Sequence, residues 1–188
     1  MRTFNGNNVS ESIFNIEHSM YQGRPFTTVI VKNAGIMFPN FSGQQDRFAA
    51  NKPQFKPQLK PQFNLLLSEE AADDLRADGW NIRVLPPREE GDSPIYMTNI
   101  NVAFSDDGHR NPLIKIYTSL DGRKACTRIT KDTLASLDDR RLERINLRID
   151  SFNYEGDKYT MKGYLKEFQA VQKAERTTFD DDYADYQD

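Results

Sequence analysis

The chain has 188 residues, of which 37% are hydrophobic and 28% are charged, and its net charge is −3. This length and composition suit one domain with a modest core. No apolar run approaches the roughly 20 residues that a membrane helix needs, and the N-terminal MRTFNGNNVSESIF lacks the apolar stretch of a signal peptide. A single cysteine, Cys126, excludes an intramolecular disulfide and suits a reducing compartment. We therefore expect an intracellular protein that makes no contact with a membrane.

The charges are divided unevenly along the chain. All 25 Lys and Arg lie in residues 1–176 with 23 of the 28 Asp and Glu, so this body carries +2 and the last twelve residues, TTFDDDYADYQD, carry −5. Ionised carboxylates are too costly to bury without partners. We therefore predict a disordered acidic tail over 174–188, which either only solubilises the protein or attracts a basic partner.

The first half of the chain mixes polar segments with short apolar ones. Residues 1–24 are rich in Asn, Ser and Gly without a clear period, which predicts an extended N-terminal arm. The alternation in FTTVIVKNAGIMF (26–38) predicts a strand, with a bend or a bulge at its Ala-Gly pair. The repeat KPQFKPQLKPQF (52–63) has regularly spaced prolines that exclude a helix, so we expect an extended, polyproline-like loop. FNLLL then predicts a strand, and SEEAADDLRADG predicts a short helix that is capped by Ser68 and ends at Gly79.

The second half alternates more regularly between apolar and polar residues. WNIRVL (80–85), IYMTNINVAF (95–104), LIKIYT (113–118) and RINLRIDSF (144–152) each place Ile, Leu or Val on one face, which predicts half-buried strands. GRKACTRIT and YTMKGYLKEFQAVQ predict further strands, and DTLASLDDRRL predicts one or two helical turns. Many short strands, frequent turns and one clear helix predict a mainly β fold. Either an OB-like barrel of five or slightly more strands or a sandwich fits this pattern.

Motifs for catalysis or metal binding are weak. The sequence contains no HxH, CxxC or HExxH spacing and no GxxxxGK[ST] phosphate loop. Aspartate pairs at 73–74, 106–107 and 138–139 are the residue type of a magnesium site, but solvated turns and a helix face explain them more simply. Cys126 has no base near it in the sequence. We therefore expect no enzymatic activity, no cofactor and no metal.

Cations and aromatic residues share the polar faces of the predicted strands. Single-stranded nucleic acid requires this combination, because cations neutralise phosphates and exposed rings stack on bases. Trp80, Tyr96 and Phe104 share faces with Ile and Val, so we expect them in the core. Stacking is expected from Tyr117, Phe152 and Tyr154. Phosphate contacts are expected from Lys32, Lys52, Lys56, Lys60, Arg83, Lys115, Arg123, Lys124, Arg128 and Arg148.

Several stretches resemble phage-encoded single-stranded DNA-binding proteins of the OB-fold type. They are NAGIMFPNFSG, FNLLLSEEAADDLRADGWNIRVLPPREEGD, INVAF, PLIKIYTSLDGR, LERINLRIDSF and KGYLKEFQAVQ. The resemblance covers residues 26–172, and its most specific part is the order DGWN…EEGD after a short helix. It implies an OB-fold domain over 25–173 that binds single-stranded DNA without strong sequence preference. It also implies a non-enzymatic role in phage DNA replication or recombination in the host cytoplasm.

The C-terminal tail is similar in charge and position to the acidic tails with which replicative proteins of this type recruit partners. The resemblance therefore implies a polymerase, helicase or recombinase as a partner, and we expect the tail to compete with DNA for the cationic groove. Two departures limit this resemblance: the chain ends on an aspartate rather than an apolar residue, and the KPQ repeat is longer than the family's polar, basic connection. The expected partner contacts are Phe179, Asp180, Asp181, Asp182, Tyr183, Asp185, Tyr186 and Asp188.

The residues also leave other functions open. A phage assembly module could use the same β surface and the proline-rich loop to bind a protein. An RNA-binding protein would need the same cations and rings. A nuclease built on the aspartate pairs would require magnesium. The sequence also leaves a homodimer open.

Overall fold

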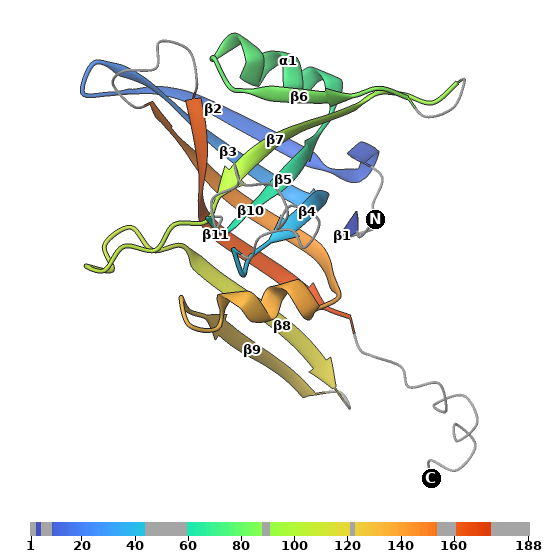
Figure 1. The fold of residues 1–188 in the computed structure, drawn as a ribbon, viewed down its shortest axis with the longest axis vertical. Coiled ribbons are helices and arrows are strands. Elements are labelled where there is room, and N and C mark those ends of the chain that lie inside the picture. The colour runs from blue at the N-terminus through green and yellow to red at the C-terminus, as the bar shows by residue number, and fades with distance from the viewer. Residues whose placement is uncertain are drawn as a thin grey trace, which may run out of the picture.

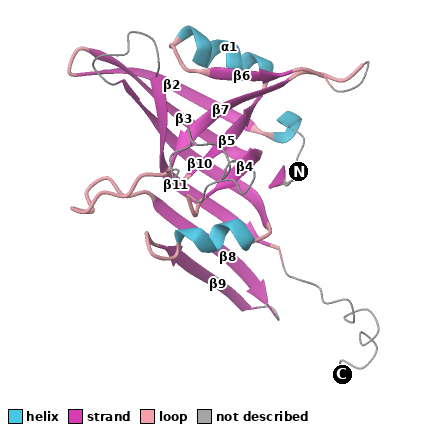
Figure 2. Ribbon diagram, viewed as in Figure 1, coloured by secondary structure: helices cyan, strands magenta, loops and turns pink. Residues whose placement is uncertain are grey.

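The computed structural model describes residues 3–4, 9–43, 60–87, 91–120, 123–153 and 161–173. This part of the chain is mainly β (Figures 1 and 2), which confirms the predicted class. Within it, no helix is long and apolar enough to cross a membrane. The strands are β1 (Thr3–Phe4), β2 (Ile13–Tyr21), β3 (Arg24–Ala34), β4 (Ile36–Asn40), β5 (Gln62–Leu67), β6 (Ile82–Leu85), β7 (Ile95–Asn101), β8 (Leu113–Leu120), β9 (Arg123–Ile129), β10 (Leu142–Asn153) and β11 (Met161–Gln172). The helices are α1 (Glu69–Ala77) and the short 3-10 helices η1 (Val9–Glu11) and η3 (Leu134–Asp139).

The strands form one curved sheet. Its order is β1-β4-β5-β7-β11-β10-β3-β2, with β6 paired to β7 and the β8–β9 hairpin attached to β11 through β8. β11 runs parallel to β7 and to β8, whereas the other pairs are antiparallel. No pairing among the described strands joins the two ends of this order, so the sheet is open. The expectation of a closed barrel is therefore wrong.

A bend at Gly35 lets one continuous segment supply two strands of the sheet. β3 pairs with β10, and β4, which begins one residue after β3 ends, pairs with β5 on the other side. A Cβ atom at Gly35 would lie 3.0 Å from Cδ1 of Leu66. A residue without a side chain therefore suits this close approach. The bend that the Ala-Gly pair predicts is present here.

One face of the curved sheet forms the hydrophobic core. Inward residues of β3 and β10, such as Val29 and Ile149, are completely buried. Three phenylalanines from distant segments pack together at the centre, with ring centroids 5.8 Å apart for Phe41 and Phe63 and 6.0 Å apart for Phe41 and Phe168. Phe63, the last residue of the KPQ repeat, is thus a core residue.

Helix α1 lies over one end of the sheet (Figure 1) and has the predicted caps. The Ser68 side chain accepts a hydrogen bond from the backbone N–H of Ala71 at 3.2 Å, and Gly79 ends the turn with φ of 87°. The backbone N–H of Met161 donates to the Gly79 carbonyl at 3.0 Å, which joins the end of this turn to the start of β11. Trp80, directly after it, is buried as expected.

The predicted segment boundaries fall partly outside the described residues. Residues 13–21 of the expected N-terminal arm form β2, which pairs with β3 along its whole length. Most of the KPQ repeat and the whole predicted tail, 174–188, lie outside the part of the chain that the structure describes.

We expect substitution of Gly163 to destabilise the fold. A Cβ atom at this position would lie 2.6 Å from Cζ3 of Trp80 and 2.8 Å from Cδ1 of Ile100, so Gly163→Ala overpacks a rigid indole ring. The free energy of unfolding, measured by urea denaturation with circular dichroism, should fall by about 1–3 kcal/mol. Gly35→Ala is the matched control, because it meets only the movable end of Leu66 and should cost less. Equal stability of Gly163→Ala and the wild type would contradict this packing.

Candidate nucleic-acid interface

The face of the sheet that points away from the core carries polar and aromatic side chains. In β10, Leu147 and Ile149 are buried, so Arg148 and Phe152 lie on the opposite face. The register places Asp150 opposite Tyr164 of β11 and Phe152 opposite Lys162. Phe152 and Tyr164 make an edge-to-face contact with ring centroids 6.4 Å apart. Both side chains line a cavity.

The cavity has a volume of about 280 Å³ and is lined by four aromatic side chains and two cations. Phe26 comes from β3, Phe152 from β10, Tyr164 from β11 and Phe104 from the segment after β7. The cations are Arg110 and Lys166. Known small-molecule sites span about 300–1,000 Å³, so this cavity suits one flat ring system better than a larger compact ligand.

One carboxylate, Asp150, also lines the cavity. Its Oδ1 accepts a hydrogen bond from the Thr28 hydroxyl at 3.1 Å and lies 3.8 Å from Nε of Arg148. The nearby guanidinium offsets its negative charge, as expected for a partly buried acid. Asp150 therefore does not by itself make the cavity repel an anion.

The segment that carries Arg110 is ordered by its own side chains. The Asn111 Oδ1 atom accepts a hydrogen bond from the Ser105 backbone N–H at 2.7 Å. Two hydrogen bonds hold the pKa of Asp107 below its usual value. The larger effect comes from the Ser105 side chain and the smaller one from the His109 backbone N–H. These contacts define the loop on the cavity's edge before any ligand arrives.

A second cationic surface, which we call the β8–β9 arm, consists of Lys115, Tyr117, Lys124 and Arg128. Because Ile114 and Ile116 are fully buried, Lys115 and Tyr117 point away from the core. Lys115 pairs with Arg128 across the hairpin, and Tyr117 pairs with Cys126. Parallel pairing of β8 with β11 places this arm on the same core-averted face as Tyr164 and Lys166.

Of the other residues predicted to contact nucleic acid, Lys32 on β3 and Arg148 on β10 are also exposed on this face. Arg83 lies on β6, at the other end of the molecule from the β8–β9 arm (Figure 1). Lys60 is exposed and precedes Pro61, whose carbonyl accepts a hydrogen bond from the Val102 backbone N–H at 2.9 Å, so it lies near the segment of Phe104. Lys52, Lys56, Tyr154, the side chain of Arg123 and all the tail residues lie outside the described part.

Several residues of the cavity were not predicted from the sequence. Tyr164 and Lys166 follow the alternation of β11, so their outward direction was available from the pattern. Phe104 packs against the core, as expected, and lines the cavity as well. Phe26 and Arg110 gave no local signal, since their role depends on β3 and the loop after β7 meeting at β10.

The aspartate pairs serve structural roles in the described residues. Both carboxylate oxygens of Asp138 accept backbone N–H hydrogen bonds at 2.8 Å, from Phe41 and Ser42. Asp106 lies 3.1 Å from the Lys131 ammonium group, and Asp73 pairs with Arg76. No group of three or more His, Cys, Asp or Glu able to hold a metal occurs in the described ranges.

One family model matches most of the chain. The family described as "Putative phage ssDNA-binding domain" matches residues 19–186. The fold is similar to that of the single-stranded DNA-binding protein from bacteriophage Enc34 in complex with ssDNA, with 9% identity, a TM-score of 0.39, and coverage of 79% of this chain and 88% of that one. A C-terminal truncation of the Enc34 protein matches with 8% identity, a TM-score of 0.36, and coverage of 90% of this chain and 100% of that one. No curated protein matches the sequence.

Both structural likenesses are weak, so the assignment depends on the family match, which spans nearly the whole chain. The stretches whose resemblance to phage proteins was noted above lie within the matched residues. The chain belongs to the phage ssDNA-binding domain family.

Proposed function

We propose that the protein binds single-stranded DNA on the core-averted face of its sheet. The observation that carries this proposal is the cavity in which Phe26, Phe104, Phe152 and Tyr164 meet beside Arg110 and Lys166. Aromatic side chains stack on bases with about 1–3 kcal/mol each, whatever the base, because every base offers a π face. Cations beside them neutralise phosphates and release counterions.

The same cavity favours a single strand over a duplex. A base can enter it only after leaving its stack, which costs a few kcal/mol in a duplex and least in a strand that is already single. The β8–β9 arm offers further phosphate contacts at Lys115, Lys124 and Arg128. The proposed path of the strand therefore crosses β11 between the cavity and this arm.

The order of the strands supports an OB-type arrangement of this site. OB folds are five-stranded, partly open barrels that bind oligonucleotides beside the loops after the first and fourth strands. Counting β3 and β4 as one bent strand, the other four are β5, β7, β10 and β11. The described residues that precede β5 and end β10 lie near the cavity, through Pro61 and Phe152.

The acidic tail supplies the proposed regulation and recruitment. Its five aspartates are tethered to a body of opposite charge, so their effective concentration at the cationic face is high and is screened by salt. Bound DNA displaces the tail, and the aromatic residues Phe179, Tyr183 and Tyr186 then dock on basic pockets of a replication protein. The proposed setting is phage DNA replication or recombination inside the host cell, without catalysis by this protein.

The first test is the binding of labelled oligo-dT, followed by fluorescence anisotropy at several salt concentrations without magnesium. We expect tight binding to the single strand and much weaker binding to the same sequence as a duplex. The logarithm of the affinity for the single strand should fall linearly with the logarithm of the salt concentration, with a slope of about −0.7 per phosphate contact. An oligo-U of equal length reports on RNA. Equal affinity for the duplex, or no binding even after removal of the tail, would contradict the proposal. The protein would then be better explained as a protein-interaction module.

Truncation of Phe152 tests the cavity. Phe152→Ala removes one stacking ring and should weaken oligo-dT binding by roughly 5-fold or more, which corresponds to about 1 kcal/mol or more. Val84→Ala on β6 is the control, because Val84 is 45% exposed and Phe152 is 44% exposed. The control should bind as the wild type does. If the two variants bind equally well, the cavity is not the stacking site.

Deletion of residues 177–188 tests the tail. We expect the truncated protein to bind oligo-dT more tightly at low salt and equally at high salt, where screening removes the competition. Replacing the five tail aspartates by asparagine in the full-length protein is the matched control and should have the same effect. Unchanged affinity at low salt would contradict the proposed competition between the tail and DNA, and only the proposed recruitment of partners would then stand.

A further inference from the structure

The β2–β3 hairpin lies next to the cavity, which its residue Phe26 helps to line. Its register runs without a break from Ile13 opposite Lys32 to Tyr21 opposite Arg24. Gln22 and Gly23 form the two-residue turn, with φ of 51° and 76°, which is the left-handed backbone that tight hairpin turns require. The turn therefore defines which side chains share each face at the tip.

The face of the tip that carries Tyr21 continues the aromatic face of the cavity. Ser19 lies opposite Phe26, and Tyr21 lies opposite Arg24, so these four side chains project to one side. The rings of Tyr21 and Phe26 are 6.5 Å apart, and Phe26 lines the cavity together with Phe152 and Tyr164. Four neighbouring strands, β2, β3, β10 and β11, thus each contribute one ring to a row.

The exposure and charge of the tip suit an anionic, ring-bearing ligand. Tyr21 is 65% exposed and its ring is continuous with the aromatic residues of the cavity through Phe26, and contiguous exposed apolar surface marks binding sites. Residues 19–26 contain one cation, Arg24, and no carboxylate. An acidic protein surface would find only one positive charge here, whereas a nucleic acid strand leaving the cavity finds both a ring and a cation.

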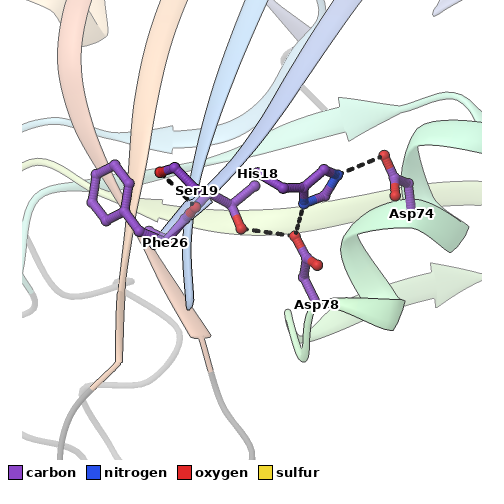
Figure 3. Close-up of polar contacts among 7 residues, drawn as sticks. His18, Ser19, Phe26, Asp74 and Asp78 are labelled. Atoms are coloured by element: carbon purple, nitrogen blue, oxygen red, sulfur yellow. Dashed lines mark hydrogen bonds and ion pairs between the residues drawn. The ribbon is translucent and has the colours of Figure 1, made fainter. Parts of the chain in front are cut away.

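Polar contacts hold the hairpin in place on two sides. Nδ1 of His18 lies 2.8 Å from Oδ2 of Asp78, and its Nε2 lies 3.5 Å from Oδ2 of Asp74 on α1 (Figure 3). The Thr27 hydroxyl donates to the same Asp78 oxygen at 2.7 Å, and the Thr27 backbone N–H donates to the Ser151 hydroxyl at 2.7 Å. Because Ser151 also lines the cavity, the hairpin has a defined position relative to it.

We propose that the tip of the β2–β3 hairpin is a second subsite for single-stranded DNA, in which Tyr21 stacks on a base beyond the one in the cavity and Arg24 lies by its phosphate. This inference depends on the proposed function, because the strand reaches the tip from the cavity. A fixed wall of this kind lowers the ordering cost of binding. It also extends the site from β3 onto β2.

The test compares Tyr21→Ala with Met20→Ala. Met20 is 67% exposed and neighbours Tyr21, but it projects from the opposite face of the hairpin. With labelled oligo-dT of roughly 16 nucleotides, Tyr21→Ala should bind about 5- to 10-fold more weakly than wild type. Met20→Ala should bind as the wild type does, and so should Tyr21→Phe, which retains the ring.

A single nucleotide separates the tip from the cavity. With dTMP, whose one base can fill only the cavity, Tyr21→Ala should bind as the wild type does, whereas Phe152→Ala should still bind more weakly. Wild-type affinity of Tyr21→Ala for the long oligonucleotide, with Phe152→Ala still impaired, would overturn the subsite and leave the proposed function standing. If neither variant is impaired with either ligand, both proposals fail. Thermal unfolding of each variant checks that the fold is intact.

Discussion

Burial of one face of β3, β10 and β11 is the constraint on which the rest of the structure depends. Side chains alternate along a strand, so placing Val29, Ile149 and Leu165 in the core forces their neighbours to the opposite face. A register shift of one residue would bring Arg148 inside and Ile149 outside. The hydrophobic core therefore determines where the charges and rings of the candidate interface can lie.

The bend at Gly35 and the loop after β7 turn this face into a cavity. The bend brings β4 and β5 round to β7, whose end lies beside Tyr164 at the start of β11. The chain then leaves the sheet after Asn101 and returns at β8, and the intervening loop supplies Phe104 and Arg110. β7 and β8 therefore pair in parallel with successive parts of β11, and the loop between them lines the cavity.

Cations and rings in one place have a consequence for specificity. Stacking and phosphate contacts recognise features that all nucleotides share, so the proposed site selects for single-strandedness rather than for sequence. The carboxylate of Asp150 does not prevent the binding of a phosphate strand, because its Oδ1 accepts a hydrogen bond from Thr28 and lies close to the Arg148 guanidinium. The β2–β3 hairpin, held through His18 and Thr27, adds a wall that is positioned before binding.

Local patterns in the sequence determined the strands, the capped helix α1 and the direction of side chains such as Arg148, Phe152 and Tyr117, because alternation and capping depend only on neighbouring residues. They also supported the family, through ordered motifs along the chain. Only the tertiary structure decided that the sheet is open, that β2 belongs to it, and that Phe26, Phe104 and Tyr164 share a cavity. Those features depend on pairings between segments far apart in the chain, which no local pattern encodes. Loop closure and core packing select these pairings together.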